Sequence, residues 1–187
     1  MTTITKAIVL RAQQGDEGAE RTIVDELQRP VIATIYRCLG PARGADVEAI
    51  AQELFLDLFR NIGRFDARRM KFTTWVYELV RDRCADVLAS QPRAPSGAAA
   101  TRDHSDVGAL QKSQAGEATE LDRRIAEVLS TLSEEQRMAF VLHEYERLEH
   151  SEIATITGVN ETTVKSRLAR AKESLRVQLQ PYLNAEA

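Results

Sequence analysis

The sequence has few cysteines, few aromatic residues and no long apolar run. Only two of its 187 residues are cysteine, and 5% are aromatic. Cys38 and Cys84 each lie within an apolar helical pattern, so we expect small buried hydrophobic residues rather than a disulfide or a redox switch. No window of about 18 apolar residues is present, which excludes a membrane-spanning helix, and residues 1–10 are too mixed for a signal peptide. These absences predict a cytoplasmic protein.

The chain also lacks the basic excess that nucleic-acid-binding proteins usually carry, since its formal net charge is -3. The charge is unevenly distributed, however. Residues 61–93 carry seven Lys/Arg against four Asp/Glu, and residues 159–187 carry five against three. Two modestly basic surfaces separated by acidic ones predict weak affinity for bare DNA, because that affinity comes from neutralised phosphates. The pattern suits a protein that reads DNA only when another component helps to hold it there.

Apolar residues recur at helical spacing along most of the chain, and no segment has a convincing strand pattern. We therefore predict an all-α protein with two helical domains, at residues 1–90 and 118–187. Between them, residues 91–117 are rich in Pro, Gly, Ala and Ser, which is typical of a flexible linker. Such a linker would coil to roughly 30 Å end to end and could stretch towards ~85 Å.

Turn and capping residues predict where the helices begin and end. In the first domain we expect one helix from about Glu17, a second from Pro30 to Leu39, a third from Asp46 to about Asn61, and a last from Thr73 or Thr74 to near Ala89. In the second domain we expect a helix over residues 121–129. Ser133 followed by Gln136 fits a capping box, which predicts another helix ending near Tyr145.

The segment from residue 149 to 176 has the pattern of a helix-turn-helix. A short helix over residues 151–157 is followed by Gly158, which is free to adopt a left-handed conformation, and by Asn160, which is suited to cap the next helix. The second helix has an apolar stripe, and its other face carries hydroxyl and cationic side chains: Thr162, Thr163, Lys165, Ser166, Arg167, Arg170 and Lys172. This arrangement predicts a helix that lies in a DNA major groove. The alternative is an ordinary solvated cationic face.

Residue spacing argues against an enzyme. His143 and Glu144 suggest a zinc-binding helix, but the second ligand should follow four residues after His143, where the chain has Arg147. Neither a glycine-rich phosphate loop nor a nucleophile arrangement is present. We expect no catalytic residue, no metal site, no cofactor and no small-molecule substrate.

Both predicted domains resemble the sigma-70 family, and specifically the bacterial extracytoplasmic-function (ECF, group 4) sigma factors. The second domain resembles region 4 through LSEEQRMAFVLHEYERLEHSEIATITGVNETTVKSRLARAKESLR. The first resembles region 2 through Gly15-Asp16, Gln52-Glu53-Leu54-Phe55, Arg64-Phe65-Asp66, Phe72-Thr73-Thr74-Trp75 and Asp86, in the family's order. The resemblance covers about four fifths of the chain, and both domains in this order and at this length are specific to the family.

The resemblance implies a factor that binds core RNA polymerase and directs promoter-specific initiation. The first domain would take the -10 element and the second the -35 element, and a separate anti-sigma factor would hold the protein inactive. The polymerase core would bind Asp46, Gln52, Glu53 and Phe55. The -10 element would contact Arg68, Arg69, Lys71, Arg81, Asp82 and Arg83, and the -35 element Thr162, Thr163, Lys165, Ser166, Arg167 and Arg170. Leu54, Leu58 and Trp75 are expected to pack in the core. In the holoenzyme the protein would be associated with the nucleoid.

The chain departs from the family pattern at four points. Ala49 replaces an acidic residue, the loop between Phe65 and Phe72 is one residue longer, Asp82 replaces an asparagine, and Ala89-Ser90 replace a basic pair. An acid near a DNA strand repels phosphate, so Asp82 must face a base, a partner cation or solvent. Two alternatives remain open: an autonomous helix-turn-helix regulator, and a sigma-like decoy that binds an anti-sigma factor.

Overall fold

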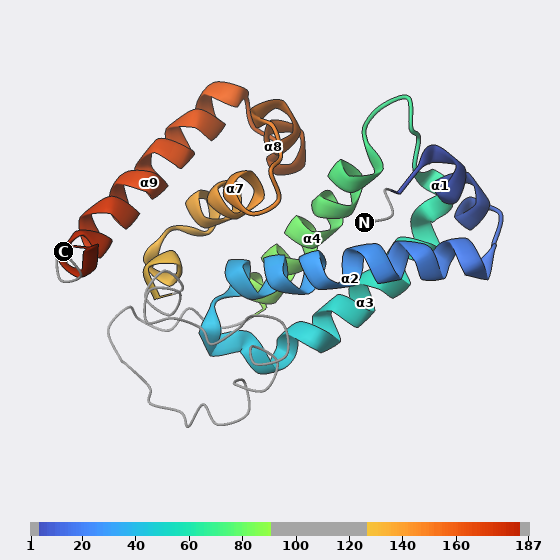
Figure 1. Ribbon diagram of the computed structural model, residues 1–187, viewed down its shortest axis with the longest axis horizontal. Coiled ribbons are helices and arrows are strands. Elements are labelled where there is room, and N and C mark those ends of the chain that lie inside the picture. Colours follow the sequence, from blue (N-terminus) through green and yellow to red (C-terminus); the bar gives the residue numbers. More distant parts are fainter. Residues whose placement is uncertain (1–3, 91–126, 184–187) are drawn as a thin grey trace.

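A computed structural model describes residues 4–90 and 127–183, and every regular element in these two ranges is a helix (Figure 1). The first range, which we call the first lobe, contains α1 (Lys6–Gln13), α2 (Glu17–Leu39), η1 (Pro41–Asp46), α3 (Val47–Asn61), η2 (Ile62–Arg64) and α4 (Phe72–Ala89). The second range, the second lobe, contains a helical segment at residues 127–131, then α7 (Glu134–Glu144), α8 (His150–Thr157) and α9 (Glu161–Leu183). The predicted all-α class is confirmed. The whole predicted linker, residues 91–117, and the start of the helix expected over residues 121–129 lie outside the described residues.

The helix α2 is continuous, although the sequence predicted a break before Pro30. It runs for 23 residues with Pro30 in its interior. Proline removes one backbone hydrogen bond of a helix and strains the preceding turn, so it normally ends or kinks one. Here Ile23, Leu27, Val31 and Ile35 form one buried stripe on both sides of the proline, and each is at most 6% exposed. Burial of this stripe outweighs the local cost of Pro30.

The other predicted helix boundaries agree with the structure to within one or two residues. The Asp16 carboxylate accepts the backbone N–H of Ala19 at 2.9 Å and caps α2. The Ser133 hydroxyl accepts the backbone N–H of Gln136 at 3.3 Å and caps α7, so that half of the predicted capping box is present. These caps satisfy N–H groups that have no partner within the helix.

The helices of the first lobe enclose an apolar core that includes the two cysteines. Leu54 and Leu58 on α3 are 1% and 0% exposed, which confirms the prediction that they are core residues. Cys38 and Cys84 are both buried and both free. A hydrogen bond with the Cys84 thiol, together with burial, raises the pKa of the Cys38 thiol well above its ordinary value. The prediction of small buried residues without a disulfide is therefore confirmed.

The two lobes pack directly against each other, which the sequence pattern did not predict. Helix α7 lies against α2, and α8 lies against α4, while α9 lies at the outer edge of the molecule (Figure 1). One hydrophobic cluster continues from the first lobe into α7, α8 and the first half of α9. A smaller cluster joins residues 128–132 to Ala171 and Leu175 on α9. Within the described residues, no helix is long and apolar enough to cross a membrane.

Candidate nucleic-acid interface

Local hydrogen bonds build the predicted helix-turn-helix from α8, a tight turn and α9. The Glu152 carboxylate accepts the backbone N–H of Glu149 at 3.1 Å, which closes the start of α8. Gly158 ends α8 in the left-handed conformation, with φ of 68°, that favours glycine. The Asn160 side-chain oxygen accepts both the backbone N–H of Thr163 at 2.8 Å and its hydroxyl at 3.0 Å. The turn chemistry predicted from the sequence is therefore present.

Helix α9 buries its apolar stripe against the rest of the second lobe and presents its polar face outward. Val164, Leu168 and Ala171 are at most 4% exposed, whereas most of the predicted -35 residues are exposed. Those exposed are Thr162, Lys165, Ser166 and Arg170; Thr163 and Arg167 are half-buried. The Thr163 hydroxyl already donates to the Asn160 cap, so its position is fixed by the turn.

An acidic side chain lies close to this cationic face. The Glu135 backbone N–H and the Ser133 hydroxyl lower the pKa of the Glu135 carboxyl, and the nearby charge of Arg167 lowers it further. Glu135 therefore stays ionised next to Arg167. Its negative charge reduces the net positive charge of the face.

Three aromatic rings support the loop that precedes α4. Phe65 and Phe72 meet edge to face with centroids 5.2 Å apart, and Trp75 lies 5.6 Å and 5.8 Å from them. The predicted packing role of Trp75 is confirmed by these contacts. The Gln13 amide donates to the carbonyls of Ile62 and Phe65, at 2.9 Å each, and holds the start of the loop. Sequence reasoning missed Gln13, because nothing in the pattern of α1 indicates which carbonyls a distant amide will reach.

The six residues predicted to contact the -10 element fall into two groups. Arg68, Arg69 and Lys71 are exposed on the loop before α4. On α4, Arg81 forms an ion pair with Asp82 at 2.6 Å, so a neighbouring cation neutralises the acid. Arg83 instead forms ion pairs with Glu53, at 3.3 Å, and with Asp57, both on α3. The structure thus joins a predicted DNA residue, Arg83, to a predicted polymerase residue, Glu53, and uses Arg83 to tie α4 to α3.

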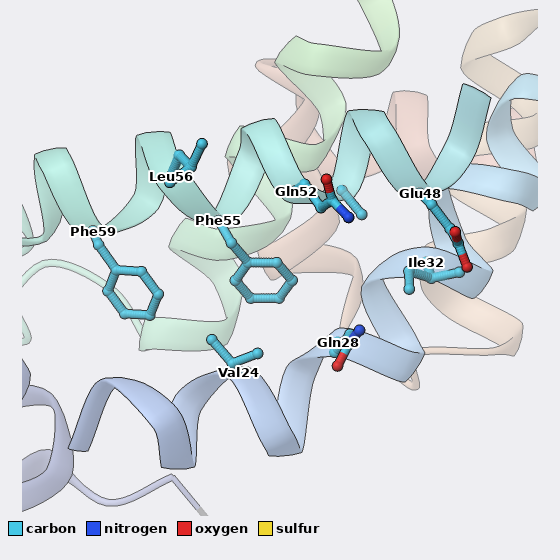
Figure 2. A pocket seen from close by; sticks show the side chains of 9 residues that line it. Val24, Gln28, Ile32, Glu48, Gln52, Phe55, Leu56 and Phe59 are labelled. Carbon is cyan, nitrogen blue, oxygen red and sulfur yellow. The ribbon is translucent and has the colours of Figure 1, made fainter. Parts of the chain in front are cut away.

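An open groove of about 510 Å³ runs between α2 and α3 (Figure 2). Phe55 and Phe59 point from α3 towards Val24 on α2, and form its apolar floor. Its other lining residues are Gln28, Ile32, Glu48, Ala51, Gln52 and Leu56. Two of the predicted polymerase-binding residues, Gln52 and Phe55, therefore line the same groove. Asp46 lies at the end of η1 and Glu53 is exposed, and neither is among the lining residues.

Leu56 is an exposed residue of this groove that sequence reasoning missed. It is 56% exposed, although it is a large apolar side chain on a helix whose neighbours Phe55 and Leu58 are buried. In the sequence, Leu56 is one of several apolar residues in a run that begins with Leu54 and Phe55, so nothing marks it as exposed. Only the packing of α2 against α3 decides which member of that run faces solvent.

Two carboxylates of the second lobe make polar contacts with the first lobe. Glu152 on α8 accepts the Thr74 hydroxyl at 3.1 Å and pairs with the Lys71 ammonium at 3.2 Å. Burial raises the pKa of the Glu152 carboxyl, but hydrogen bonds from the Glu149 N–H, Lys71 and Thr74 outweigh that effect, so its pKa lies below the ordinary value.

The second carboxylate is that of Glu146, which follows α7. It accepts the Thr34 hydroxyl of α2 at 2.7 Å and the Tyr77 hydroxyl of α4. Burial and the Glu146 charge raise the pKa of Tyr77 well above its ordinary value, so the phenol remains a hydrogen-bond donor. Nearby, the Arg37 guanidinium lies 4.0 Å from the centroid of the Tyr145 ring. No sequence pattern predicted the two bonds of Glu146, because Thr34 and Tyr77 lie 112 and 69 residues away from it along the chain.

The histidines considered as zinc ligands form a different arrangement. His143 and His150 stack with ring centroids 5.1 Å apart, and His143 Nδ1 lies 2.8 Å from a Glu144 oxygen. Lys172 pairs with the same carboxylate at 2.8 Å. Across residues 4–90 and 127–183, no group of three or more His, Cys, Asp and Glu side chains is arranged to hold a metal ion.

Comparison with known proteins agrees with this geometry. Residues 23–94 match the family Sigma-70 region 2, and residues 122–175 match Sigma-70, region 4. Two solved structures share the fold. CnrH in complex with the cytosolic domain of CnrY has a TM-score of 0.68 and 18% identity, and the match covers 98% of this chain and 99% of that chain. The sigma factor RpoE in complex with the anti-sigma factor NepR from Bartonella quintana has a TM-score of 0.59 and 20% identity, and the match covers 86% of this chain and 98% of that chain.

Curated relatives match over nearly their full length. The RNA polymerase sigma-H factor of Pseudomonas aeruginosa is 29% identical over 184 residues, covering 94% of each chain. The ECF RNA polymerase sigma-E factor of Haemophilus influenzae is 30% identical over 186 residues, covering 95% of this chain and 96% of the relative. With both sigma regions present in order, the chain belongs to the ECF sigma factors of RNA polymerase.

Proposed function

We propose that this protein is a group 4 sigma factor that binds core polymerase through the groove between α2 and α3 and then reads two promoter elements. The groove is the observation that carries the proposal. It is apolar at its floor, it is open to solvent, and it contains Gln52 and Phe55. A factor that depends on polymerase needs such a docking surface, whereas an autonomous DNA-binding protein does not.

For the -35 element, we assign the exposed polar face of α9 to the major groove. Arg170 is suited to a guanine, because its guanidinium can donate two hydrogen bonds to one base edge. Lys165 and Arg167 would contact phosphates, and Thr162, Thr163 and Ser166 would bond to phosphates or base edges. The apolar back of α9 holds this face in place through Val164 and Leu168, which are 0% and 4% exposed.

For the -10 element, we assign the loop and first turns around Arg68, Arg69 and Lys71. A strand that leaves the duplex can place an unstacked base against protein, and exposed cations there would track its phosphates. Arg81 would contribute only if a strand displaces its bond to Asp82, since the two side chains lie 2.6 Å apart. Arg83 would act by positioning α4 on α3.

The proposed partners are core polymerase, promoter DNA and a separate anti-sigma factor in the cytoplasm. The anti-sigma assignment is supported by the related fold of RpoE, which was solved with the anti-sigma factor NepR. An inhibitor that covers the groove would compete directly with polymerase.

Run-off transcription with bacterial core polymerase and a promoter library tests this proposal. Specific new transcripts are expected only when the protein is added. Leu56→Arg should abolish core binding, because a charge would occupy the lip of an apolar groove. Val177→Arg is the matched control, since Val177 on α9 is also 56% exposed and receives the same charge. Arg170→Ala should preserve core binding and reduce promoter discrimination by roughly 10- to 100-fold.

The negative outcomes separate the alternatives. Stable core binding without transcripts would favour a decoy. The absence of both core binding and transcripts would overturn the proposal. It would favour an autonomous regulator, which should then bind free duplex DNA strongly.

A further inference from the structure

Three sulfur atoms from three different helices meet inside the protein. Cys38 lies near the end of α2, Cys84 on α4 and Met138 on α7, and α2 packs against both of the other helices (Figure 1). The Cys38 thiol donates to the Met138 sulfur at 3.6 Å and also forms a hydrogen bond with the Cys84 thiol. Cys38, Cys84 and Met138 are 4%, 1% and 8% exposed. These three residues therefore form one buried group of sulfur atoms, which we call the sulfur cluster.

The donor atoms of the sulfur cluster suit a soft monovalent cation. Thiolate and thioether sulfurs favour Cu(I), whereas a structural Zn(II) site is almost always completed by four ligands. Across residues 4–90 and 127–183, no His, Asp or Glu joins the two cysteines to complete such a site. Two cysteines and one methionine instead match the three sulfur ligands that Cu(I) accepts. No spacing motif predicted this group, because Cys38 and Met138 lie 100 residues apart along the chain.

The spacing of the sulfurs is close to that of a metal site. If an ion lies ~2.3 Å from each of three sulfurs in one plane, each pair of sulfurs is ~4 Å apart. The distance of 3.6 Å between Cys38 Sγ and Met138 Sδ is shorter by only a few tenths of an ångström. Methionine has three rotatable side-chain bonds and adapts readily to its surroundings. Small torsion changes within the side chains can therefore admit the ion.

Arg137 supplies the positive charge that such a site needs. Cu(I) replaces the protons of two thiols, so the loaded sulfur cluster carries a net negative charge, which is costly to bury without a partner. The Arg137 guanidinium is itself buried and donates to the Cys38 carbonyl at 2.9 Å. A hydrogen bond with Cys84 and burial raise the pKa of the Cys38 thiol, while the charge of Arg137 opposes them. A cation is thus already held beside a ligand that must lose its proton.

We propose that Cys38, Cys84 and Met138 bind a single Cu(I) ion, with Arg137 as the neighbouring counter-charge. The copper stays monovalent and the two displaced protons leave to solvent, so the step needs no oxidant or reductant. The bound ion connects α2 and α4 of the first lobe to α7 of the second. None of these four residues belongs to the surfaces assigned to polymerase or promoter DNA, so the inference goes beyond the proposed function and does not depend on it.

Anaerobic titration of the full chain with Cu(I), in competition with a chromogenic Cu(I) chelator, measures stoichiometry and affinity. We expect a single ion per chain, with the ultraviolet charge-transfer absorption of thiolate-bound copper. The melting temperature should rise by roughly 5–10 °C when free Cu(I) is about 100 times its dissociation constant. Zn(II) at the same concentration should not compete. Failure to take Cu(I) from the chelator, or equal affinity for Zn(II), would overturn the inference.

Variants assign the ligands. Cys38→Ser and Cys84→Ser should each abolish binding in the competition, because a hydroxyl is a poor ligand for a soft cation. Met138→Leu nearly preserves the side-chain volume and should weaken binding by about 10-fold or more, since even the outer partners of a metal site contribute this much. Met70→Leu is the matched control, because Met70 lies in the loop before α4, and it should leave the affinity unchanged. Wild-type affinity in either serine variant, or equal losses in the two leucine variants, would refute the assignment.

X-ray absorption by the copper-loaded wild-type protein tests the site without any substitution. The expected spectrum is that of Cu(I) bound by sulfur alone, at about 2.3 Å as for other metal-bound thiolates. Nitrogen ligands would instead place the ion at histidines such as the stacked pair His143 and His150, and would contradict the inference. Run-off transcription without copper remains the test of the proposed function. A protein that directs initiation but binds no Cu(I) would keep that function and lose this site, and the converse result would do the opposite.

Discussion

Arg137 on α7 is a cation, only 8% exposed, that bonds to three backbone carbonyls. One guanidinium nitrogen donates to the Cys38 carbonyl at 2.9 Å, in the last turn of α2. The other donates to the Leu132 carbonyl at 3.2 Å and, more weakly, to the Ser130 carbonyl at 3.4 Å. Arg137 thus joins the end of α2 to the second lobe and places positive charge where the α2 dipole is negative.

Replacing Arg137 with alanine should lower the free energy of unfolding by about 2–4 kcal/mol. The two shorter bonds are charge-assisted and stabilise by roughly 3–6 kcal/mol together. The buried guanidinium offsets part of this gain, because its desolvation lowers the pKa of Arg137 and its Nε has no partner within the described residues. For a chain of this size the loss corresponds to a decrease in melting temperature of roughly 4–15 °C.

Denaturant unfolding followed by circular dichroism measures the change. Arg137→Met retains much of the volume but not the donors, so it should lose nearly as much stability as Arg137→Ala. The matched control is Arg176→Ala, because Arg176 is a solvent-exposed arginine paired with Glu173 on its own helix. If Arg137→Ala and the control unfold at the same denaturant concentration, or if Arg137→Met restores wild-type stability, the reasoning is refuted.

Two further predictions concern backbone strain and pH. Gly40→Ala should cost roughly 1–3 kcal/mol in unfolding experiments, because its φ of 83° and ψ of 168° suit only glycine; Gly63→Ala, with open space around it, is the control and should be nearly neutral. The pKa of Glu152 is lowered below 4.5 in the folded protein, so its stabilisation is present above about pH 4.5 and is lost as pH falls through the lowered value. The stability difference between wild type and Glu152→Gln should therefore shrink in acid, and a pH-independent difference would contradict this sign.

Most of the local structure could be predicted from the sequence. Gly158 and Asn160 specify the turn of the helix-turn-helix because one tolerates positive φ and the other caps α9, and both effects act within a few residues. The apolar spacing of α9 likewise predicted which face is buried. The exception was Pro30, where a local rule predicted a break and the long buried stripe of α2 maintained the helix.

The candidate site was only partly predictable, because its residues depend on long-range partners. The sequence identified Arg83 and Glu53 as members of different surfaces, but not their ion pair at 3.3 Å. It identified Asp82 as an acid that needs a partner, and the structure supplies Arg81. Gln13 and Leu56 carried no signal, since an amide and a leucine on a helix are informative only once their neighbours are known.

The sequence by itself determined an all-α chain and its helix-turn-helix, because periodicity, capping and turn conformation are set by residues close in the chain. The motifs of its two domains carried the resemblance to the sigma factors. Only the tertiary structure decided that the two lobes close on each other. That contact depends on Glu146 meeting Thr34 and Tyr77, and on Glu152 meeting Lys71 and Thr74. Such pairs form when separate apolar faces pack in one register, and no local pattern encodes that register.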